Sequence, residues 1–171
     1  MKNKQQWYQE VVRKLLRQKN IRVHKWFAWR QESDIAYAWL TDDDKPMVIL
    51  PYPKTLATFY VCLHEIGHVC RPSSFYGKHE YVNEYLAETW ALKYCKEKLN
   101  INPTREEHFA KYYVLSKLLP QWRRSVDPSN VRKDILKWLN VKPNELDVAI
   151  LSRKAFLRHY KAYGTLKISI K

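Results

Sequence analysis

His64-Glu65-Ile66-Gly67-His68 is an HExxH pattern within Leu56–Arg71, a stretch without proline that predicts one continuous helix. Two histidines four positions apart on a helix differ by about 40° around its axis and by about 6 Å along it. Both rings therefore project from one face toward a common point, as two ligands of Zn²⁺ must. Glu65 lies close enough to act as a base on a water held at that point. A catalytic zinc site also needs a third protein ligand, and the identity of that ligand decides the class of the site.

The composition indicates an ordinary globular protein. The chain has 171 residues, of which 46% are hydrophobic and 28% charged, which suits one domain or one domain with a helical appendage. The polar start of the sequence predicts no signal peptide, and no apolar run approaches the roughly 18 residues of a membrane span. The three cysteines, Cys62, Cys70 and Cys95, form no CxxC pair. We therefore expect reduced thiols and a cytoplasmic protein without membrane contact.

The net charge of +14 is distributed unevenly along the chain. Residues 1–30 contain nine lysines and arginines against one acid, residues 31–100 contain seven against ten, and residues 101–171 contain fifteen against six. The HExxH region is thus mildly acidic and both flanks are basic. Such flanks are suited to contact nucleic acid or another polyanion. The alternative is that they are solvated basic helices without a charged partner.

Apolar periodicity predicts a helix, then a small sheet, then further helices. Residues 4–19 have helical spacing, and three strands are expected at about 21–29, 35–40 and 47–51, paired as a meander. Pro51 and Pro53 suggest that the third strand lies at an edge or ends there. Thr55 can cap the HExxH helix. The helices expected after it span about 79–99, 104–119, 127–139 and 143–163. This order of elements predicts an α+β fold.

Two candidates for the third ligand follow the HExxH helix. One is His79, and the other is a glutamate in Glu84-Tyr85-Leu86-Ala87-Glu88. The metzincin pattern requires a histidine at position 74, which is serine here, so that class is excluded. In the SprT-like DNA-repair proteases the third histidine comes somewhat later and precedes a glycine, whereas His79 precedes Glu80.

The stretch Glu84–Glu88 together with HExxH resembles the gluzincin zinc metallopeptidases, in which a second helix supplies a glutamate within an E-x-x-A-[DE/N] pattern. Asn83-Glu84 is also similar to the N-E pair of thermolysin-like enzymes. The short helix–sheet–helix–helix layout most resembles the compact ImmA/IrrE-like metallopeptidases. It also resembles the core of the CaaX-prenyl-protease family, but that family is embedded in membrane. The resemblance covers roughly residues 55–92 by motif and 1–100 by the order of elements.

This resemblance implies a zincin-like (minigluzincin) core over residues 1–102, followed by a basic helical extension over residues 103–171 that is packed on the core or appended to it. It implies that His64, His68 and Glu84 hold Zn²⁺ and that Glu65 is the catalytic base. Glu88, one turn after Glu84, would hydrogen-bond a ligand histidine and fix its tautomer. The alternative for Glu84 and Glu88 is an ordinary solvated helix face.

Related enzymes also suggest where the substrate binds. Zincins usually lay the substrate along an edge strand, and Met47–Leu50 would serve. A tyrosine or histidine often stabilises the oxyanion, and Tyr76, His79 and Tyr81 are the candidates here. The sequence does not choose among them.

The leading hypothesis is therefore a zinc-dependent metalloendopeptidase that hydrolyses a peptide bond in a specific protein substrate, such as a repressor or another regulator. One alternative is a non-catalytic nucleic-acid- or protein-binding factor on a zincin scaffold. Another is a SprT-like DNA-associated protease. Residues 135–146 have the pattern of a helix-turn-helix, but Glu145 and Asp147 would place negative charge at the start of the recognition helix.

Overall fold

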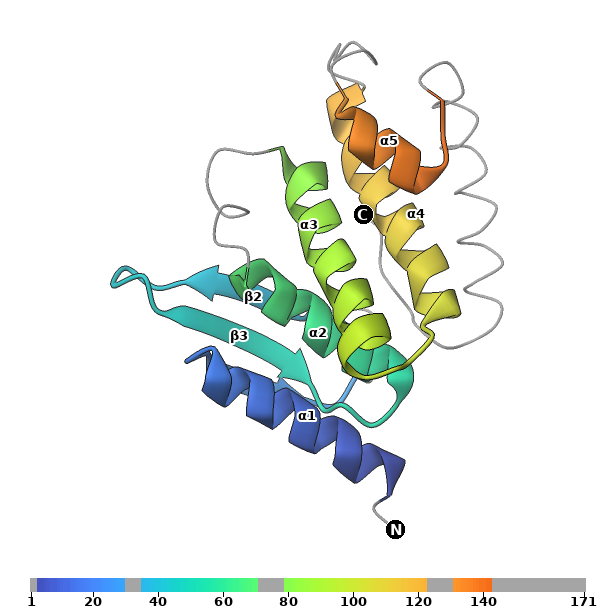
Figure 1. The fold of residues 1–171 in the computed structure, drawn as a ribbon. Coiled ribbons are helices and arrows are strands. Elements are labelled where there is room, and N and C mark those ends of the chain that lie inside the picture. The colour runs from blue at the N-terminus through green and yellow to red at the C-terminus, as the bar shows by residue number, and fades with distance from the viewer. Residues whose placement is uncertain (1–2, 30–34, 71–78, 123–130, 143–171) are drawn as a thin grey trace.

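The structure is a computed structural model that describes residues 3–29, 35–70, 79–122 and 131–142. Within these residues the chain forms five α-helices, one π-helical turn and a mixed three-stranded sheet, so the expected α+β class is confirmed (Figure 1). The elements in chain order are α1 (Lys4–Gln18), β1 (Arg22–Phe27), β2 (Tyr37–Leu40), β3 (Pro46–Pro51), α2 (Leu56–Cys70), α3 (Glu80–Lys93), η2 (Tyr94–Lys98), α4 (Thr104–Trp122) and α5 (Lys133–Leu139).

The helices begin and end at residues with recognisable capping chemistry. Asn3 caps α1, because its side chain accepts a hydrogen bond from the backbone N–H of Gln5 at 3.1 Å. The hydroxyl of Thr55 accepts one from the backbone N–H of Thr58 at 3.2 Å, which confirms the expected cap of α2. After α1, η2 and α5 the chain turns at residues with positive φ, namely Asn20, Asn100 and Asn140. Asparagine tolerates this left-handed conformation better than most residues, so it ends these helices at little cost.

The strand pairing differs from the expected meander. β3 is the middle strand: it pairs in parallel with β1 and antiparallel with β2. The prediction that Met47–Leu50 forms an edge strand is therefore wrong, and β1 and β2 are the edges of this sheet. Pro51 instead marks the end of β3. The apolar run of β3 suits the central position, because both of its sides are paired. Alternation of apolar residues identifies strands but does not specify their partners, which explains the error.

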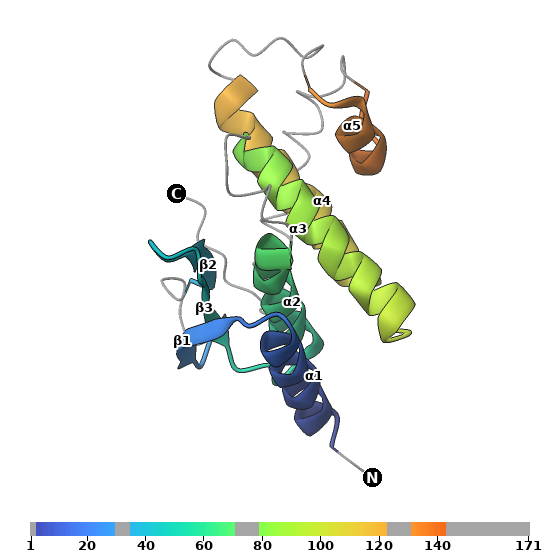
Figure 2. The same cartoon turned by 60° about the vertical axis from the view of Figure 1, so that its left-hand side comes forward.

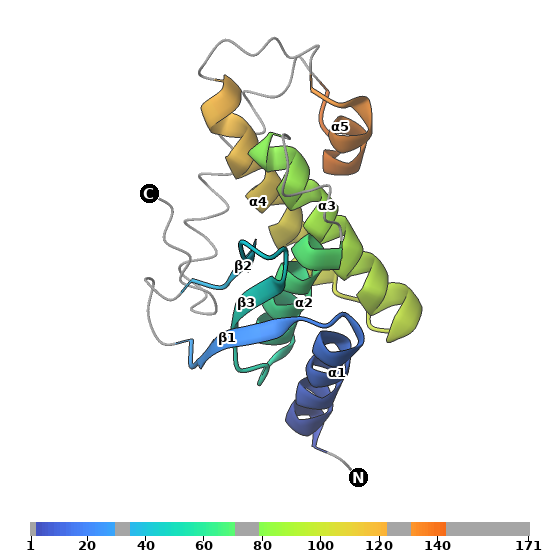
Figure 3. The ribbon, with the colours of Figure 1, turned by 90° about the vertical axis from the view of Figure 1, so that its left-hand side faces the viewer.

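The main core lies between the sheet and α2, with α1 alongside. α2 packs across β3 and β2, and α1 packs against α2 (Figures 2 and 3). Tyr8 of α1 stacks on Phe59 of α2 with ring centroids 4.5 Å apart. Val48 and Leu50 of β3 are fully buried on the same side of the sheet. Burial of this apolar surface is the main source of stability for the sheet–helix layer.

A second core joins α3, α4 and α5. α3 packs against α2 on one side and against α4 on another, so it connects the two cores. The buried members of the second core are Tyr81, Val82, Val114, Leu115, Leu118, Val131, Ile135, Leu136 and Leu139. The described part of the proposed extension thus packs on the Glu84 helix. No helix in the described part of the chain is long and apolar enough to cross a membrane.

Some helix boundaries differ from those predicted, and some predictions lie outside the described residues. α4 continues through Pro120 to Trp122, whereas the sequence predicted a stop at about residue 119. A proline this close to a helix end removes only one hydrogen bond of the last turn. The predicted helix over 127–139 is described only from residue 131, with α5 beginning at Lys133. The predicted helix over 143–163 and the second half of the helix-turn-helix pattern lie outside the described residues.

Candidate metal centre

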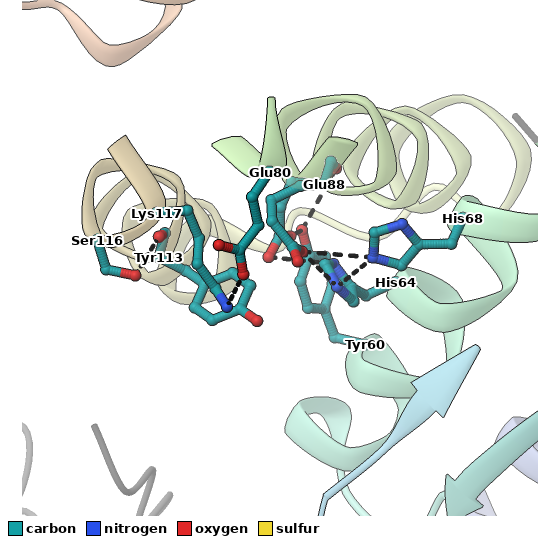
Figure 4. Close-up of polar contacts among 9 residues, drawn as sticks. Tyr60, His64, His68, Glu80, Glu88, Tyr113, Ser116 and Lys117 are labelled. Atoms are coloured by element: carbon teal, nitrogen blue, oxygen red, sulfur yellow. Dashed lines mark hydrogen bonds and ion pairs between the residues drawn. The ribbon is translucent and has the colours of Figure 1, made fainter. Parts of the chain in front are cut away.

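The two histidines of the HExxH pattern face one another across one turn of α2, as their spacing predicts. The Nε2 atoms of His64 and His68 lie 3.2 Å apart, and their rings are perpendicular with centroids 4.8 Å apart. Both side chains are largely buried. Figure 4 shows both rings directed from α2 toward α3.

Glu84 of α3 completes a group of three ligand atoms. Its Oε2 lies 3.2 Å from Nε2 of His64 and 3.3 Å from Nε2 of His68. In a tetrahedral zinc site with bonds of about 2.0–2.1 Å, neighbouring ligand atoms are about 3.3–3.4 Å apart. The three measured separations, 3.2, 3.2 and 3.3 Å, match one face of such a tetrahedron. Among the described residues, these three form the group whose side chains could hold a metal ion.

The surroundings of this group contain several buried carboxyl groups. The buried charged or polar side chains in the described residues are one histidine and four glutamates, with no lysine or arginine. Three of those glutamates, Glu65, Glu84 and Glu88, are on α2 and α3 beside the histidines. Oε2 of Glu84 is buried and makes no hydrogen bond despite its short distances to both histidines. A buried carboxylate is expensive without a cation or hydrogen-bond donors, and a divalent cation at this point would compensate it.

The pKa values follow from the same surroundings. Burial by itself would lower the pKa of His64, but the carboxylates of Glu88 and Glu84 outweigh it and raise that pKa well above its usual value. Burial would raise the pKa of Glu84, but the two histidines dominate and lower it. Without a metal, the neighbouring imidazoles are therefore the groups that favour the charged form of Glu84. A metal ion would replace the proton on His64, because imidazole binds metal in its neutral form.

Glu88 supports the ligand histidine His64. Its Oε1 lies 3.2 Å from Nδ1 of His64, and its Oε2 accepts a hydrogen bond of 2.6 Å from the hydroxyl of Tyr60 (Figure 4). Glu88 is only 2% exposed. The alternative of a solvated helix face for Glu84 and Glu88 is therefore wrong. Tyr60 fixes the carboxylate, and the carboxylate can fix the ring of His64, which is how second partners usually orient metal-binding histidines.

Glu65 lies beside the ligand group but outside it. It is buried, and the charges of His64, His68, Glu84 and Glu88 all act on its carboxyl group. Burial is the largest influence and raises its pKa, while the two histidines lower it. A carboxyl group in this position can accept and release a proton next to the metal centre.

Gly67 of the HExxH pattern sets the distance between α2 and α3. A Cβ at this position would lie 2.8 Å from the backbone oxygen of Ala87 and 3.2 Å from its Cα. Ala87 is itself fully buried. The small residues on both helices allow this close crossing, which brings Glu84 within reach of the histidines.

Tyr113 of α4 is a residue of this site that sequence reasoning missed. Its ring contacts that of His64 edge-on, with centroids 5.9 Å apart. Burial and then the negative charges of Glu84, Glu65 and Glu88 raise the pKa of its hydroxyl. Nζ of Lys117 lies 5.2 Å from the centre of the same ring (Figure 4). The only signal in the sequence was an aromatic residue on a helix that must pack on α3, and the register between the two helices could not be predicted.

The other oxyanion candidates are located elsewhere. His79 precedes α3, is exposed, and stacks on Tyr81 with ring centroids 5.7 Å apart. Tyr81 is buried in the second core, where its hydroxyl interacts with the backbone of Arg132. Tyr76 lies outside the described residues. His79 is also absent from the group of three ligand atoms, where Glu84 takes the third place.

Comparisons with protein-family models, curated proteins and solved structures found no match to this chain. Inferences about function therefore rest on the site itself. Two imidazole nitrogens and one carboxylate oxygen form a donor set that catalytic zinc sites use. The spacing of these atoms, and the buried oxygen of Glu84 that lacks a hydrogen bond, both fit such an ion.

Proposed function

We propose that this protein is a zinc-dependent metalloendopeptidase with a compact zincin-like core of gluzincin type, similar to the ImmA/IrrE-like group. One observation carries the proposal: the ligand atoms of His64, His68 and Glu84 have the separations of a tetrahedral zinc face, with a buried Glu65 beside them. An exposed ion pair of a glutamate and a histidine would need neither this spacing nor this burial.

The bound metal and the chain's own residues have separate roles. When bound, the zinc ion lowers the pKa of a water and polarises the peptide carbonyl. Glu65 accepts the proton of the water as its oxygen attacks the carbonyl carbon. The C–N bond then breaks, and Glu65 delivers the proton to the leaving amine. Glu88 and Tyr60 hold the ring of His64 in its binding orientation.

Tyr113 is the tyrosine to which we assign the role of stabilising the oxyanion of the substrate. Its ring contacts that of His64, and burial with the carboxylates of Glu84 and Glu65 raises the pKa of its hydroxyl, whereas the hydroxyl of Tyr81 is engaged with the backbone of Arg132. A neutral phenol can donate a hydrogen bond to the oxygen of the scissile carbonyl as negative charge develops there.

The strand of the sheet that we expect to bind the substrate is β2 and not β3. β3 is paired on both sides, so it has no free edge for an extended peptide. β2 is an edge strand that packs on the HExxH helix α2. An extended segment of a protein substrate, such as a regulator or repressor, can add through main-chain hydrogen bonds to the outer edge of β2, with which no other described strand pairs.

The test compares wild-type protein with Glu65→Gln. Both proteins should contain about one zinc ion per chain, because Glu65 is not in the ligand group. Hydrolysis should fall by at least about 100-fold in the variant, since general acid–base catalysis contributes about 10²–10⁴-fold. Zinc is measured by mass spectrometry of the metal, and cleavage by the appearance of new N-termini in a mixture of cytoplasmic proteins.

Glu97→Gln is the matched control, because Glu97 is an exposed acid on η2 and is not in the ligand group. It should retain both zinc and hydrolysis. If Glu65→Gln cleaved as fast as wild type, the assignment of the base would be wrong. If wild type bound zinc and produced no more new N-termini than Glu65→Gln, the non-catalytic alternative would replace the peptidase.

A further inference from the structure

The sheet has a second face, on the side away from α2. Side chains alternate along a strand, and Ala38, Val48 and Leu50 are buried toward α2. The residues between them therefore point to the other side, where no described helix lies (Figure 2). We call this surface the outer sheet face. Its residues are Arg22, Lys25, Tyr37, Trp39, Met47 and Ile49.

The register arranges these six residues in two rows across the strands. Arg22 pairs with Met47 and Met47 with Trp39, while Lys25 pairs with Ile49 and Ile49 with Tyr37. Each row therefore consists of a cation on β1, an apolar residue on β3 and an aromatic residue on β2. Neighbouring strands are about 4.8 Å apart, so cation and ring backbones in a row are about 10 Å apart.

The two aromatic residues on β2, exposed Tyr37 and half-buried Trp39, are already stacked on one another. The rings of Tyr37 and Trp39 have centroids 5.8 Å apart and planes that differ by only 20°. Tyr37 is 58% exposed, which is unusual for a large aromatic residue in a strand. His24 contacts Trp39 edge-on, with centroids 5.7 Å apart. Rings held parallel at a surface can receive a further flat ring without rearrangement.

The cations of this face are available to a ligand. Arg22 and Lys25 are both exposed, and no carboxylate in the described residues forms an ion pair with either. Asp43, in the turn between β2 and β3, pairs with Lys45. That turn lies beyond the ends of these two strands, so Asp43 is not part of the outer sheet face.

We propose that the outer sheet face binds single-stranded nucleic acid. Bases stack on Tyr37 and Trp39, and the backbone phosphates contact Arg22 and Lys25. Stacking on exposed aromatic side chains beside a positive groove is how proteins bind single strands without reading their sequence. An acidic peptide would use the cations but not the stacked rings, and a duplex keeps its bases stacked on each other. The site is on the opposite side of the sheet from the metal centre, so it does not depend on zinc or on hydrolysis.

The test measures binding of fluorescein-labelled dT12 and U12 to the full-length protein by fluorescence anisotropy in 50 mM salt. Tyr37→Ala should raise Kd by at least about fivefold, as loss of one stacking residue does. Tyr37→Phe should remain near wild type, because phenylalanine keeps the ring. Tyr37 is exposed, so neither change threatens the fold, and circular dichroism checks this.

Lys25→Ala and Lys98→Ala form a second matched pair. Both remove one exposed lysine, but Lys98 is on η2, away from the sheet. Lys25→Ala should reduce the slope of log K against log salt by about 0.7, and Lys98→Ala should leave it unchanged. The proposal is overturned if dT12 and U12 do not bind, if Tyr37→Ala binds within twofold of wild type, or if a 12-base-pair duplex binds more tightly than either strand.

Discussion

At the scale of single residues, Oε2 of Glu84 is a buried carboxylate oxygen for which a metal ion is a fitting partner. It is buried, lies 3.2–3.3 Å from two imidazole nitrogens, and makes no hydrogen bond. The protein could satisfy it with a donor from a neighbouring helix, yet none of the buried charged side chains in the described residues is a lysine or arginine. An ion shared with His64 and His68 satisfies all three atoms together.

Glu84 and Glu88 should differ in their effect on zinc affinity. Glu84→Gln should weaken binding by more than about 100-fold, because it removes a charged ligand. Glu88→Gln should weaken it by about 10–100-fold, because the residue acts through His64. Competition with a chromogenic chelator measures both, with Glu97→Gln as the surface control. Equal losses at Glu84 and Glu88 would contradict their assignment to different roles.

The three cysteines should differ in reactivity. Burial raises the pKa of Cys95 to about 12, with a contribution from Glu106, and burial likewise raises that of Cys62. The thiol of Cys62 also donates a hydrogen bond to the backbone oxygen of Pro51 at 3.2 Å. Cys70, at the end of α2, is only partly buried. We expect one thiol per native chain to react quickly with Ellman's reagent, and three in denaturant.

The Cys70→Ser variant provides the control for that titration. It should show no fast reaction in the native state and two thiols in denaturant. Fast reaction of a native thiol in this variant would mean that Cys62 or Cys95 becomes accessible through local opening.

At the scale of elements, the crossing of α2 and α3 holds the metal centre together. The histidines are on one helix and Glu84 is on the other, so their distance depends on how closely the helices approach. Gly67 permits that approach, because a side chain there would meet the backbone of Ala87. Glycine at this position of HExxH is therefore explained by the close packing of the two helices and not by metal binding.

Gly67→Ala should weaken both the fold and the zinc site. The added methyl group should cost about 1–3 kcal/mol through overpacking, partly offset by up to about 1 kcal/mol from better helix propensity. Urea denaturation measures the first effect and zinc competition the second. Lys93→Ala, at an exposed position of α3, should change neither by more than about 0.5 kcal/mol. A stabilised Gly67→Ala protein with unchanged zinc affinity would contradict the close crossing.

At the scale of the whole molecule, the candidate metal centre lies where the two cores meet. α2 belongs to the first core, α3 and α4 carry the second, and the ligands and Tyr113 come from these three helices. An ion bound there connects both cores. Its free energy of binding therefore adds to the stability of the folded chain.

Removal of zinc should lower the melting temperature. At a free zinc concentration 1,000 times Kd, the ion stabilises the fold by about 4 kcal/mol. For a chain of this size this corresponds to a shift of about 10 °C, measured by calorimetry with and without a chelator. Glu84→Gln protein should show a shift less than half as large, because a site about 100-fold weaker is stabilised by only about 1.4 kcal/mol at the same zinc concentration. A chelator-independent melting temperature in wild type would argue against a bound ion.

Much of the local structure was predictable because it depends on near neighbours. The HExxH helix, its Thr55 cap and the convergence of His64 and His68 all follow from helical geometry. The assignment of Glu84 came from a resemblance in motif, and the structure brings its carboxylate to the two histidines. Strand pairing was not predictable, because the same alternating patterns allow β3 to be an edge or a central strand.

The elements and the face of α2 on which the histidines lie could be predicted from the amino-acid pattern, because both depend on contacts within a few residues. Three features became known only from the fold: Glu84 and Glu88 are buried, Tyr113 contacts His64, and β3 lies between β1 and β2. These facts depend on how helices and strands distant in the chain pack together. Packing is selected by the burial of whole surfaces, and no local pattern encodes it.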